Sequence, residues 1–561
     1  MATNPTPNLT RASTTALSRR QCLLGSAGAA VLASAAPAAQ AAKTKTQAHI
    51  VILGGGLGGI AVANRLHALL DGAKITLIDR KKEHNYQPGY TLVATGVWPV
   101  NKVRDRNADF HPPQLNWIKD MVSELDPASN TVVTASGQRV PYDYLVVAMG
   151  THQDWSLIEG MDVNAIGQKG MTSVYPSPEA AQATWASMDA FRRKGGNAVL
   201  TLPATPLKCA GAPLKMTFML RDRLAQSGTL GQSKVTFYSA LGNVFGVKVV
   251  NDNVLSRWSD LGIAVETTQK LQGIDIGAQR ARFVSPEGTS TEVPYDFIHV
   301  VPPMRAPDAV KNSDLAWKEG PFAAGGWLEV DPQTLQHRRY PNVFGVGDVN
   351  GTPRGKTAAT IKKSAPIVAG HVVDVIAGRA PGQKFDGYTS CPLIVKEGSA
   401  MLIEFDYAGK LTPSLPMIEP LQASYFAWLM KYRLPTWRRS RDEFEAHSQH
   451  QETHMYEIWL AMNIAYEIAW DLWPALLPLA LVWGAVMLIN RKKLARVTTS
   501  TLVALAVLVA LAAVLTLPSL SKSTLADMGY WVDWAALLGM AAGVGVAAAV
   551  LLWPVLALRQ R

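Results

Sequence analysis

The sequence predicts an α/β protein with two Rossmann-like domains, the first discontinuous and the second inserted into it, followed by C-terminal membrane-spanning helices. Three observations support this fold class. A glycine-rich turn joins a β-branched run to a helical pattern near the N-terminus, a second strand–loop–helix pattern follows in the middle, and long uncharged apolar segments lie near the C-terminus. With 561 residues, the chain is long enough for two or three domains and additional segments.

Residues 1–41 resemble an export signal. Arg19 and Arg20 lie in SRRQCLL, which is similar to the twin-arginine motif, although Cys22 stands where Phe is usual. An apolar run follows, and AQA at residues 39–41 fits cleavage after small residues. An ordinary Sec signal is the alternative. The twin-arginine route carries folded proteins, which suits a protein that binds its cofactor before export.

A dinucleotide-binding fingerprint occupies the start of the first domain. A β-branched run at 48–53 leads into GGGLGG at 54–59, a helical pattern at 60–70 and a strand at 74–78 that ends in Asp79. Glycines let the backbone approach a pyrophosphate, and the helix N-terminus attracts that anion. The Asp79 carboxylate is expected to bind ribose hydroxyls, which argues against a 2′-phosphate. The turn residues expected to contact the cofactor are Gly54, Gly56, Leu57, Gly58 and Gly59.

The middle of the chain carries a cysteine where a second glycine fingerprint is expected. A buried strand is predicted at 197–202, closed by Pro203, and Pro213 suits the first turn of a helix. The loop between them holds Cys209, whose thiolate is favoured by Lys208 and by the helix N-terminus. No G-x-G-x-x-G for NAD(P)H is present here. A buried cysteine packed in a turn is the alternative.

A late motif completes the first domain. Residues 142–150, YDYLVVAMG, resemble the A-x-G segment at which the chain crosses into a second domain, with the turn at Gly150. Residues 342–348, NVFGVGD, resemble the motif in which the aspartate, here Asp348, binds the ribityl chain of FAD, ahead of a helix that starts near Lys356. The pairing of both motifs predicts FAD in the first domain. The predicted boundaries are 48–165 and 325–385 for the two parts of the FAD domain and 195–320 for the inserted domain.

The region 386–445 has a different character. Cys391 is expected in a turn before a strand at 393–396, with another strand at 400–407. Residues 422–439 mix aromatic and basic side chains, which is typical of a helix in the lipid headgroup region. An ordinary packed amphipathic helix is the alternative.

Three apolar segments within residues 472–558 predict transmembrane helices at 472–489, 501–517 and 535–558. The basic loop at 490–496 predicts, by the positive-inside rule, that this loop is cytoplasmic and the preceding domains lie outside. Membrane topology therefore explains much of the net charge of +11, and no nucleic-acid motif is present. A buried helical hairpin is the alternative.

Three histidines recur on one face of a predicted helix. His447, His450 and His454 could bind a metal or relay protons, and their role stays open. No carboxylate or cysteine pattern completes a ligand set around them, so we predict no metal site.

If Cys22 is removed with the signal, Cys209 and Cys391 remain. Two cysteines in an oxidising compartment favour a disulfide, and a purely structural disulfide is the alternative.

Five segments in collinear order resemble sulfide:quinone oxidoreductases, most closely the branch that includes the mitochondrial enzymes. The resemblance covers roughly residues 48–435, and its cysteine motifs are the specific part, since the FAD motifs are shared with a wider superfamily. Beside the glycine fingerprint, the segments are YQPG at 86–89, PLKCAGAP at 206–213, VPPM at 301–304, the Asp348 motif with KTA at 356–358, and YTSCPL at 388–393.

The resemblance implies a function and a set of site residues. Sulfide would attack a redox-active pair made by Cys209 and Cys391, with the persulfide on Cys209 and the Cys391 thiolate donating electrons to the flavin, which reduces a quinone. The product would be sulfane sulfur passed to an unspecified acceptor or extended as polysulfide, and Lys356 would stabilise negative charge on the reduced ring. Residues 386–445 would face the quinone and the membrane lipid. Besides the glycine turn, the residues implied to hold FAD are Asp79, Gln87, Val122, Gly150, Asp348, Lys356, Thr357 and Ala358.

The chain departs from the family pattern by its export signal and three predicted spans, which imply a bacterial inner-membrane protein with its catalytic part in the periplasm. The spans would anchor the protein or also help to bind the quinone. Three other functions stay open: a sulfide dehydrogenase that reduces a c-type cytochrome on a partner protein, an NADH:quinone oxidoreductase, and a flavin-bearing redox sensor. Another small thiol or persulfide is an alternative substrate.

Overall fold

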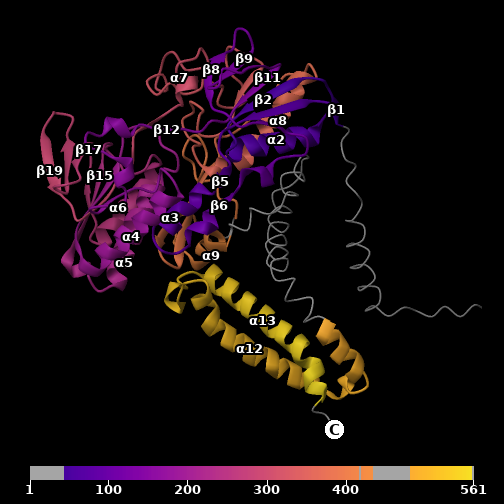
Figure 1. Cartoon of the computed structure of the whole chain (residues 1–561). Coiled ribbons are helices and arrows are strands. Elements are labelled where there is room, and N and C mark those ends of the chain that lie inside the picture. Colours follow the sequence, from indigo (N-terminus) through magenta and orange to yellow (C-terminus); the bar gives the residue numbers. More distant parts are fainter. Residues whose placement is uncertain (1–42, 416–417, 434–480, 559–561) are drawn as a thin grey trace, which may run out of the picture. The chain divides into compact units, whose positions relative to one another are not determined.

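The computed structural model of the chain describes residues 43–415, 418–433 and 481–558 (Figure 1). The helices and strands described below all lie after Lys43. Several predictions lie outside the described residues: the signal at 1–41, the helix face of His447, His450 and His454, and residues 472–480 of the first predicted span.

Five parallel strands form the first sheet, in the order β22 (Val343–Gly345), β11 (Tyr144–Val147), β2 (His49–Leu53), β4 (Lys74–Ile78) and β7 (Asn116–Ile118). Because β22 comes from a segment distant in sequence and pairs with β11, the first domain is discontinuous, as the sequence predicts. Two helices pack on one face of this sheet, α2 (Leu57–Leu69) and α8 (Ala358–Ile376), and they lie side by side in Figure 1. The other face is covered by α7 (Asp308–Lys311) and an antiparallel sheet of β8 (Val122–Asp126), β9 (Thr131–Thr134) and β10 (Arg139–Pro141).

A second parallel sheet follows the order β13 (Met171–Thr172), β20 (Phe297–His299), β14 (Gly196–Leu202), β15 (Ser233–Ser239) and β16 (Ala264–Glu266). Apolar residues of three helices form a core on one face: α4 (Pro178–Lys194), α5 (Ala212–Gln226) and α6 (Lys248–Asp260). The other face packs against the antiparallel strands β17 (Lys270–Asp275), β18 (Arg280–Val284) and β19 (Ser290–Pro294).

The two sheets divide the chain slightly differently from the expected boundaries. β13 and α4 precede residue 195, yet β13 pairs with β20 and α4 packs on the second sheet. Ala309 and Val310 precede residue 320, yet they are buried in the core of the first domain. The chain crosses between the domains at an antiparallel pair, β12 (His152–Gln153) and β21 (Met304–Arg305).

A β-hairpin and a short helix extend the core around α5. The hairpin consists of β23 (Thr389–Lys396) and β24 (Ser399–Phe405), and Cys391 lies within β23 opposite Ile403. The prediction of Cys391 in a turn is therefore wrong, because pairing with β24 continues the strand back to Thr389. Helix α9 (Tyr425–Arg433) buries Tyr425 and Trp428, so this part of residues 422–439 is a packed helix rather than one lying among lipid headgroups.

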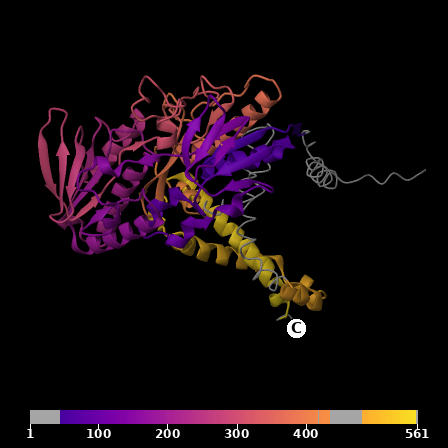
Figure 2. The same cartoon turned by 45° about the horizontal axis from the view of Figure 1, so that its top comes forward.

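Two long apolar helices end the described chain. α12 (Thr499–Leu520) and α13 (Trp531–Leu558) lie side by side in Figures 1 and 2. Both are long and apolar enough to cross a membrane, by length and composition, and a shorter apolar helix spans Leu481–Asn490. A Cβ at Gly545 would lie 2.2 Å from the Ala506 carbonyl oxygen, so this glycine permits the close approach of the two helices.

Short elements complete the described fold, and three of them lie next to YQPG at 86–89. These are α3 (Tyr90–Val93), β5 (Glu83–Asn85) and β6 (Arg104–Arg106), of which β5 and β6 form an antiparallel pair. A parallel pair of β1 (Thr44–Lys45) and β3 (Leu70–Asp71) begins the fold.

Candidate active site

The glycine turn after β2 is shaped by close backbone contacts on one side and open space on the other. Gly54 has a φ of +99°, and a Cβ there would lie 2.5 Å from the Ala148 carbonyl oxygen. A Cβ at Gly59 would lie 2.0 Å from the Gly54 carbonyl oxygen, whereas one at Gly56 would meet no described atom within 4 Å. Leu57 opens α2, and no described side chain caps this helix, so its first N–H groups are available to an anion.

Asp79 lies at the end of β4, next to this turn. One carboxylate oxygen accepts a hydrogen bond from the Gly55 N–H (2.6 Å) and the other from the Lys81 N–H (2.7 Å). Gly150, at the end of β11, has a φ of +68° and meets no described atom within 4 Å of its Cβ position. Open space over Gly56 and Gly150, beside a free helix N-terminus and an acidic strand end, fits an adenine dinucleotide such as FAD.

The second part of the FAD domain brings Asp348 and α8 to the same edge of the sheet. Thr357 caps α8, and Ala358 is its first residue. The Lys356 ammonium donates to the carbonyl oxygens of Asp348 and Asn350, both at 2.7 Å, and burial lowers its pKa to about 7. Lys356 therefore holds the Asp348 loop in place, and its role toward the flavin ring stays a prediction.

Two further residues that the resemblance implies in FAD binding lie apart from the glycine turn. Val122 begins β8 and is partly buried against the core of the first domain. Gln87 begins a short 3₁₀ segment, and its side-chain oxygen accepts a hydrogen bond from the Lys208 ammonium at 2.8 Å.

The loop that carries Cys209 is fixed by backbone contacts from both domains. Cys209 has a φ of +51°, its N–H donates to the Lys356 carbonyl oxygen (2.8 Å), and its own carbonyl oxygen accepts from the Ala212 N–H (2.8 Å). The Met304 N–H donates to the Thr205 hydroxyl at 2.9 Å. These contacts hold Cys209 in a left-handed conformation just before α5, although such backbone is unusual for a residue with a side chain.

Cys391 approaches this loop from β23. A Cβ at Gly211 would lie 2.1 Å from the Cys391 sulfur, so only glycine lets the strand come this close. The two cysteines are free thiols in this structure, and they lie close enough for each to shift the pKa of the other. The fold thus brings together two cysteines from segments far apart in sequence.

Electrostatics distinguish the two sulfurs. The hydrogen bond from the Cys391 thiol lowers the pKa of Cys209 well below its usual range; burial opposes this, and the ammonium groups of Lys215 and Lys431 reinforce it. The Lys215 Nζ lies 3.7 Å from the Cys209 sulfur. The same hydrogen bond and burial raise the pKa of Cys391. Negative charge is therefore held on Cys209.

The lysines that support this thiolate differ from the expected one. Lys208 was the residue that sequence adjacency indicated, but its ammonium binds Gln87 and the Tyr175 carbonyl oxygen, because its side chain leaves the loop in the other direction. Lys215 comes from α5 and Lys431 from α9. Lys215 was detectable as a basic residue in the helix after the cysteine loop, whereas Lys431 carried no sequence signal.

Lys431 is buried beside the cysteines. Its ammonium donates to the Pro88 carbonyl oxygen at 2.9 Å and lies 5.5 Å from the centre of the Tyr86 ring. Burial lowers its pKa to about 7, with a further contribution from the positive charge of Lys215.

Among the described residues, no group of three or more His, Cys, Asp and Glu side chains could hold a metal ion.

Two Rossmann-like domains, a glycine turn fitted to FAD and a cysteine pair where the domains meet define the class of flavin-dependent disulfide oxidoreductases. In agreement, the family model described as pyridine nucleotide-disulphide oxidoreductase matches residues 48–197. The chain belongs to the sulfide:quinone oxidoreductase family, within this class. It is an FAD-dependent oxidoreductase.

Comparison with proteins of similar sequence and structure supports this assignment. The chain is 35% identical over 395 residues to the mitochondrial sulfide:quinone oxidoreductase of Dictyostelium discoideum, an alignment that covers 70% of this chain and 85% of that protein. It is 34% identical to the mitochondrial protein of the same name from Mus musculus, over 66% of this chain and 81% of that one. The solved structure of the Aquifex aeolicus sulfide:quinone oxidoreductase has the same fold, with a TM-score of 0.58 at 23% identity, over 70% of this chain and 90% of that one.

Proposed function

We propose that this chain oxidises sulfide at the Cys209–Cys391 pair and transfers the electrons by way of FAD to a quinone. The observation that carries the proposal is the close approach of the Cys391 sulfur to the Cys209 loop at Gly211, with the Lys215 ammonium 3.7 Å from the Cys209 sulfur. Two sulfurs in contact can form and break a disulfide, and the adjacent positive charge supports the thiolate that thiol–disulfide exchange requires.

The reaction starts from the disulfide form of the pair. Hydrosulfide attacks one sulfur, the S–S bond breaks, and its electron pair leaves on the other sulfur as a thiolate, while the attacked cysteine carries a persulfide. A nucleophile, either a thiolate or a second hydrosulfide, then takes the outer sulfur and leaves a cysteine thiolate. Loss of an electron pair from the two thiolates re-forms the disulfide. Bound FAD, which the glycine turn after β2 and Asp79 would hold, would supply the acceptor for this electron pair, and a quinone that takes up two protons would be the final acceptor.

The charge distribution supports a different assignment of the two sulfurs from the one that the resemblance implies. The better leaving group in thiol–disulfide exchange is the sulfur with the lower pKa. That sulfur is Cys209, because the Lys215 Nζ lies 3.7 Å from it and stabilises its thiolate as the S–S bond opens. Cys391 therefore receives the persulfide, and Cys209 is the thiolate that donates electrons, the reverse of the expected order.

Membrane anchoring is the second part of the proposal. α12 and α13 are long and apolar enough to cross a membrane, and exposed leucines such as Leu515 (66% exposed) suit contact with lipid. The connection between the two helices bonds to the catalytic elements, whereas Arg491, Lys492 and Lys493 lie beyond the other end of α12. By the positive-inside rule, the catalytic part then lies on the side away from the cytoplasm.

The membrane and compartment form the third part of the proposal. A bacterial inner membrane with the catalytic part in the periplasm rests on the twin-arginine pattern at 1–41, since the two relatives named above are mitochondrial. N-terminal sequencing of the mature protein and protease accessibility in membrane vesicles test it. A mature chain that starts near residue 42 and a catalytic part cleaved from the exported side agree with the proposal. An uncleaved N-terminus, or cleavage only from the cytoplasmic side, contradicts it.

The experiment for the enzymatic function follows the flavin absorbance under anaerobic conditions. Sulfide should bleach the flavin of the detergent-solubilised protein, and a short-chain quinone should restore it. Cys209→Ser and Cys391→Ser should both abolish bleaching while the flavin content is unchanged, and NADH should have no effect. Equal bleaching in the cysteine variants would reject the mechanism, and bleaching by NADH would favour an NADH:quinone oxidoreductase. Reoxidation by a c-type cytochrome but not by quinone would favour the sulfide dehydrogenase.

A further inference from the structure

The start of α13 and the end of α12 are bonded to helix α9. One carboxylate oxygen of Asp533 accepts a hydrogen bond from the Phe426 N–H, in the first turn of α9, at 2.9 Å. The Ser521 hydroxyl lies 2.7 Å from the Tyr425 hydroxyl, and the Ser521 carbonyl oxygen accepts a hydrogen bond from the Trp428 indole N–H at 2.8 Å. All five residues except Phe426 are at most 2% exposed, so water does not compete for these bonds.

Helix α9 connects this contact with the cysteine pair, because Lys431 lies on the same helix. Lys431 lies five positions after Phe426, which corresponds to about 7.5 Å along a helix axis. Its ammonium donates to the Pro88 carbonyl oxygen, and the adjacent Gln87 accepts a hydrogen bond from Lys208 in the loop of Cys209. The geometry therefore places the Lys431 charge next to that loop. Because α9 is a short helix, a shift of its first turn moves Lys431 by a comparable distance. The Asp533 carboxylate also suits the partial positive charge at the N-terminus of α9.

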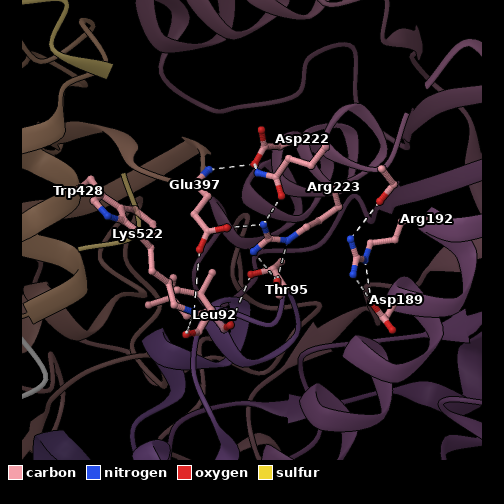
Figure 3. Close-up of polar contacts among 12 residues, drawn as sticks. Leu92, Thr95, Asp189, Arg192, Asp222, Arg223, Glu397, Trp428 and Lys522 are labelled. Atoms are coloured by element: carbon pink, nitrogen blue, oxygen red, sulfur yellow. Dashed lines mark hydrogen bonds and ion pairs between the residues drawn. The ribbon is translucent and has the colours of Figure 1, made fainter. Parts of the chain in front are cut away.

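Further contacts join the same end of the helix pair to the other elements of the site. Figure 3 shows Glu397, in the turn between β23 and β24, between Lys522 and Arg223. The Lys522 ammonium donates to the Val97 carbonyl oxygen at 2.8 Å, and Arg223 of α5 forms an ion pair with Glu397. The connection therefore contacts the β23–β24 hairpin and reaches, through Glu397, the helix that carries Lys215.

We propose that Asp533 is a positioning residue of the active site. By fixing the first turn of α9 to the membrane helix pair, it holds the Lys431 ammonium beside Cys209, so the reactivity of this cysteine depends on the docked helices. The inference rests on the proposed function for its biological meaning. Its test uses a different readout, the reactivity of Cys209 toward an alkylating agent, which needs neither sulfide nor quinone.

Asp533 acts on one of several groups around Cys209. The Asp533 bond fixes α9, and of these groups only Lys431 lies on that helix. An Asp533 variant should therefore reproduce the loss of Lys431 and leave the other contributions unchanged. The ionisable groups that interact with Cys209 are Lys208, Lys215, Lys431, Cys391, Tyr175 and Asp348.

The experiment measures the rate at which iodoacetamide alkylates Cys209 in the reduced, full-length, FAD-loaded protein, across about pH 5 to 9. Peptide mass spectrometry separates Cys209 from the other cysteines. Asp533→Ala should lower the rate at the acidic end of the profile by about three- to tenfold and move the profile to higher pH, because one supporting charge is displaced. Asp533→Asn retains an acceptor oxygen and should keep most of the wild-type rate.

Two further comparisons decide between positioning and a general loss of structure. Lys431→Met should lower the rate in the same way, and adding Asp533→Ala to it should have no further effect. Leu515→Ala, on the exposed face of α12, should match the wild type. If Asp533→Ala does not yield a folded flavoprotein, Tyr425→Phe, which removes only the hydroxyl that contacts Ser521, should give a smaller change in the same direction.

The proposal is overturned if the tested variant, Asp533→Ala or in its place Tyr425→Phe, has the wild-type pH profile. It is also overturned if the effects of Asp533→Ala and Lys431→Met add in full. Failure of the proposed function is a separate result, namely wild-type protein whose flavin is not bleached by sulfide.

Discussion

Replacement of Lys215 by Met should slow the reduction of the flavin by sulfide, because the Lys215 Nζ lies 3.7 Å from the Cys209 sulfur and stabilises its thiolate. Two unit charges about 4 Å apart interact by about 4 kcal/mol at the effective dielectric constant of about 20 that suits protein sites. Lys431 and the hydrogen bond from Cys391 remain in the variant. We therefore expect about half of this energy to be lost, which is about 2 kcal/mol or roughly thirtyfold in rate.

The assay is anaerobic stopped-flow absorbance of the flavin at saturating sulfide, across a range of pH. The ratio of variant to wild-type rates removes the ionisation of sulfide itself, since it is common to both proteins. The ratio should be smallest at low pH, where the Lys215 ammonium also keeps the released Cys209 thiolate deprotonated. It should rise with pH to a value still below one, because the ammonium stabilises the leaving thiolate throughout the range. Lys215→Arg keeps the charge and should recover most of the rate.

Lys208→Met is the matched control, because it removes a neighbouring lysine whose ammonium binds Gln87 and the Tyr175 carbonyl oxygen. Its effect should be several times smaller than that of Lys215→Met. If Lys208→Met slows the reaction as much as Lys215→Met, or if the Lys215→Met ratio is independent of pH, the electrostatic explanation is wrong.

Three further predictions concern FAD binding, the cysteine contact and stability at acid pH. Gly59→Ala should unfold the first domain or lower its melting temperature markedly, because the new Cβ would lie 2.0 Å from a carbonyl oxygen of the same turn. Gly56→Ala should fold but bind FAD more weakly. Measurements of thermal unfolding and of flavin content distinguish the two effects. Gly211→Ala should retain FAD but lose bleaching by sulfide, since its Cβ would lie 2.1 Å from the Cys391 sulfur; wild-type bleaching kinetics would contradict the assigned contact. Burial lowers the pKa of His299 to about 3, so the unfolded state binds a proton that the native state does not as the pH falls below 6.5. Stability should fall by roughly 2 to 3 kcal/mol between pH 6.5 and about 4.5, and His299→Leu should remove this part of the pH dependence in urea unfolding; an unchanged dependence would exclude the histidine as its cause.

The glycine turn and the strand end at Asp79 were predictable because their determinants are local: each follows from residues within one strand–turn–helix unit. The orientation of the Lys356 ammonium, which binds two carbonyl oxygens of the Asp348 loop, was not. Which way a long flexible side chain points depends on neighbours that the local sequence does not name.

The two cysteines of the site were predictable from the sequence, but the charged groups around them were not. Both cysteines were identified from short motifs, yet Cys391 lies within β23 because its strand pairs with β24. Lys208 is adjacent to Cys209 in sequence, but its ammonium binds Gln87, while Lys215 reaches the sulfur from the following helix. The reversal of the two sulfur roles depends on these charges.

The sequence by itself determined the α/β class, the discontinuous FAD domain, the glycine turn and the second and third of the three predicted apolar spans, because each is a periodic or local pattern. Only the tertiary structure decided that Gly211 admits Cys391 to the loop of Cys209, that Lys431 lies beside the pair, and that Asp533 joins α13 to α9. These are contacts between segments far apart in the chain. The charge of Lys431 or the missing Cβ of Gly211 affects the cysteines only after packing has brought a second segment of the chain against it.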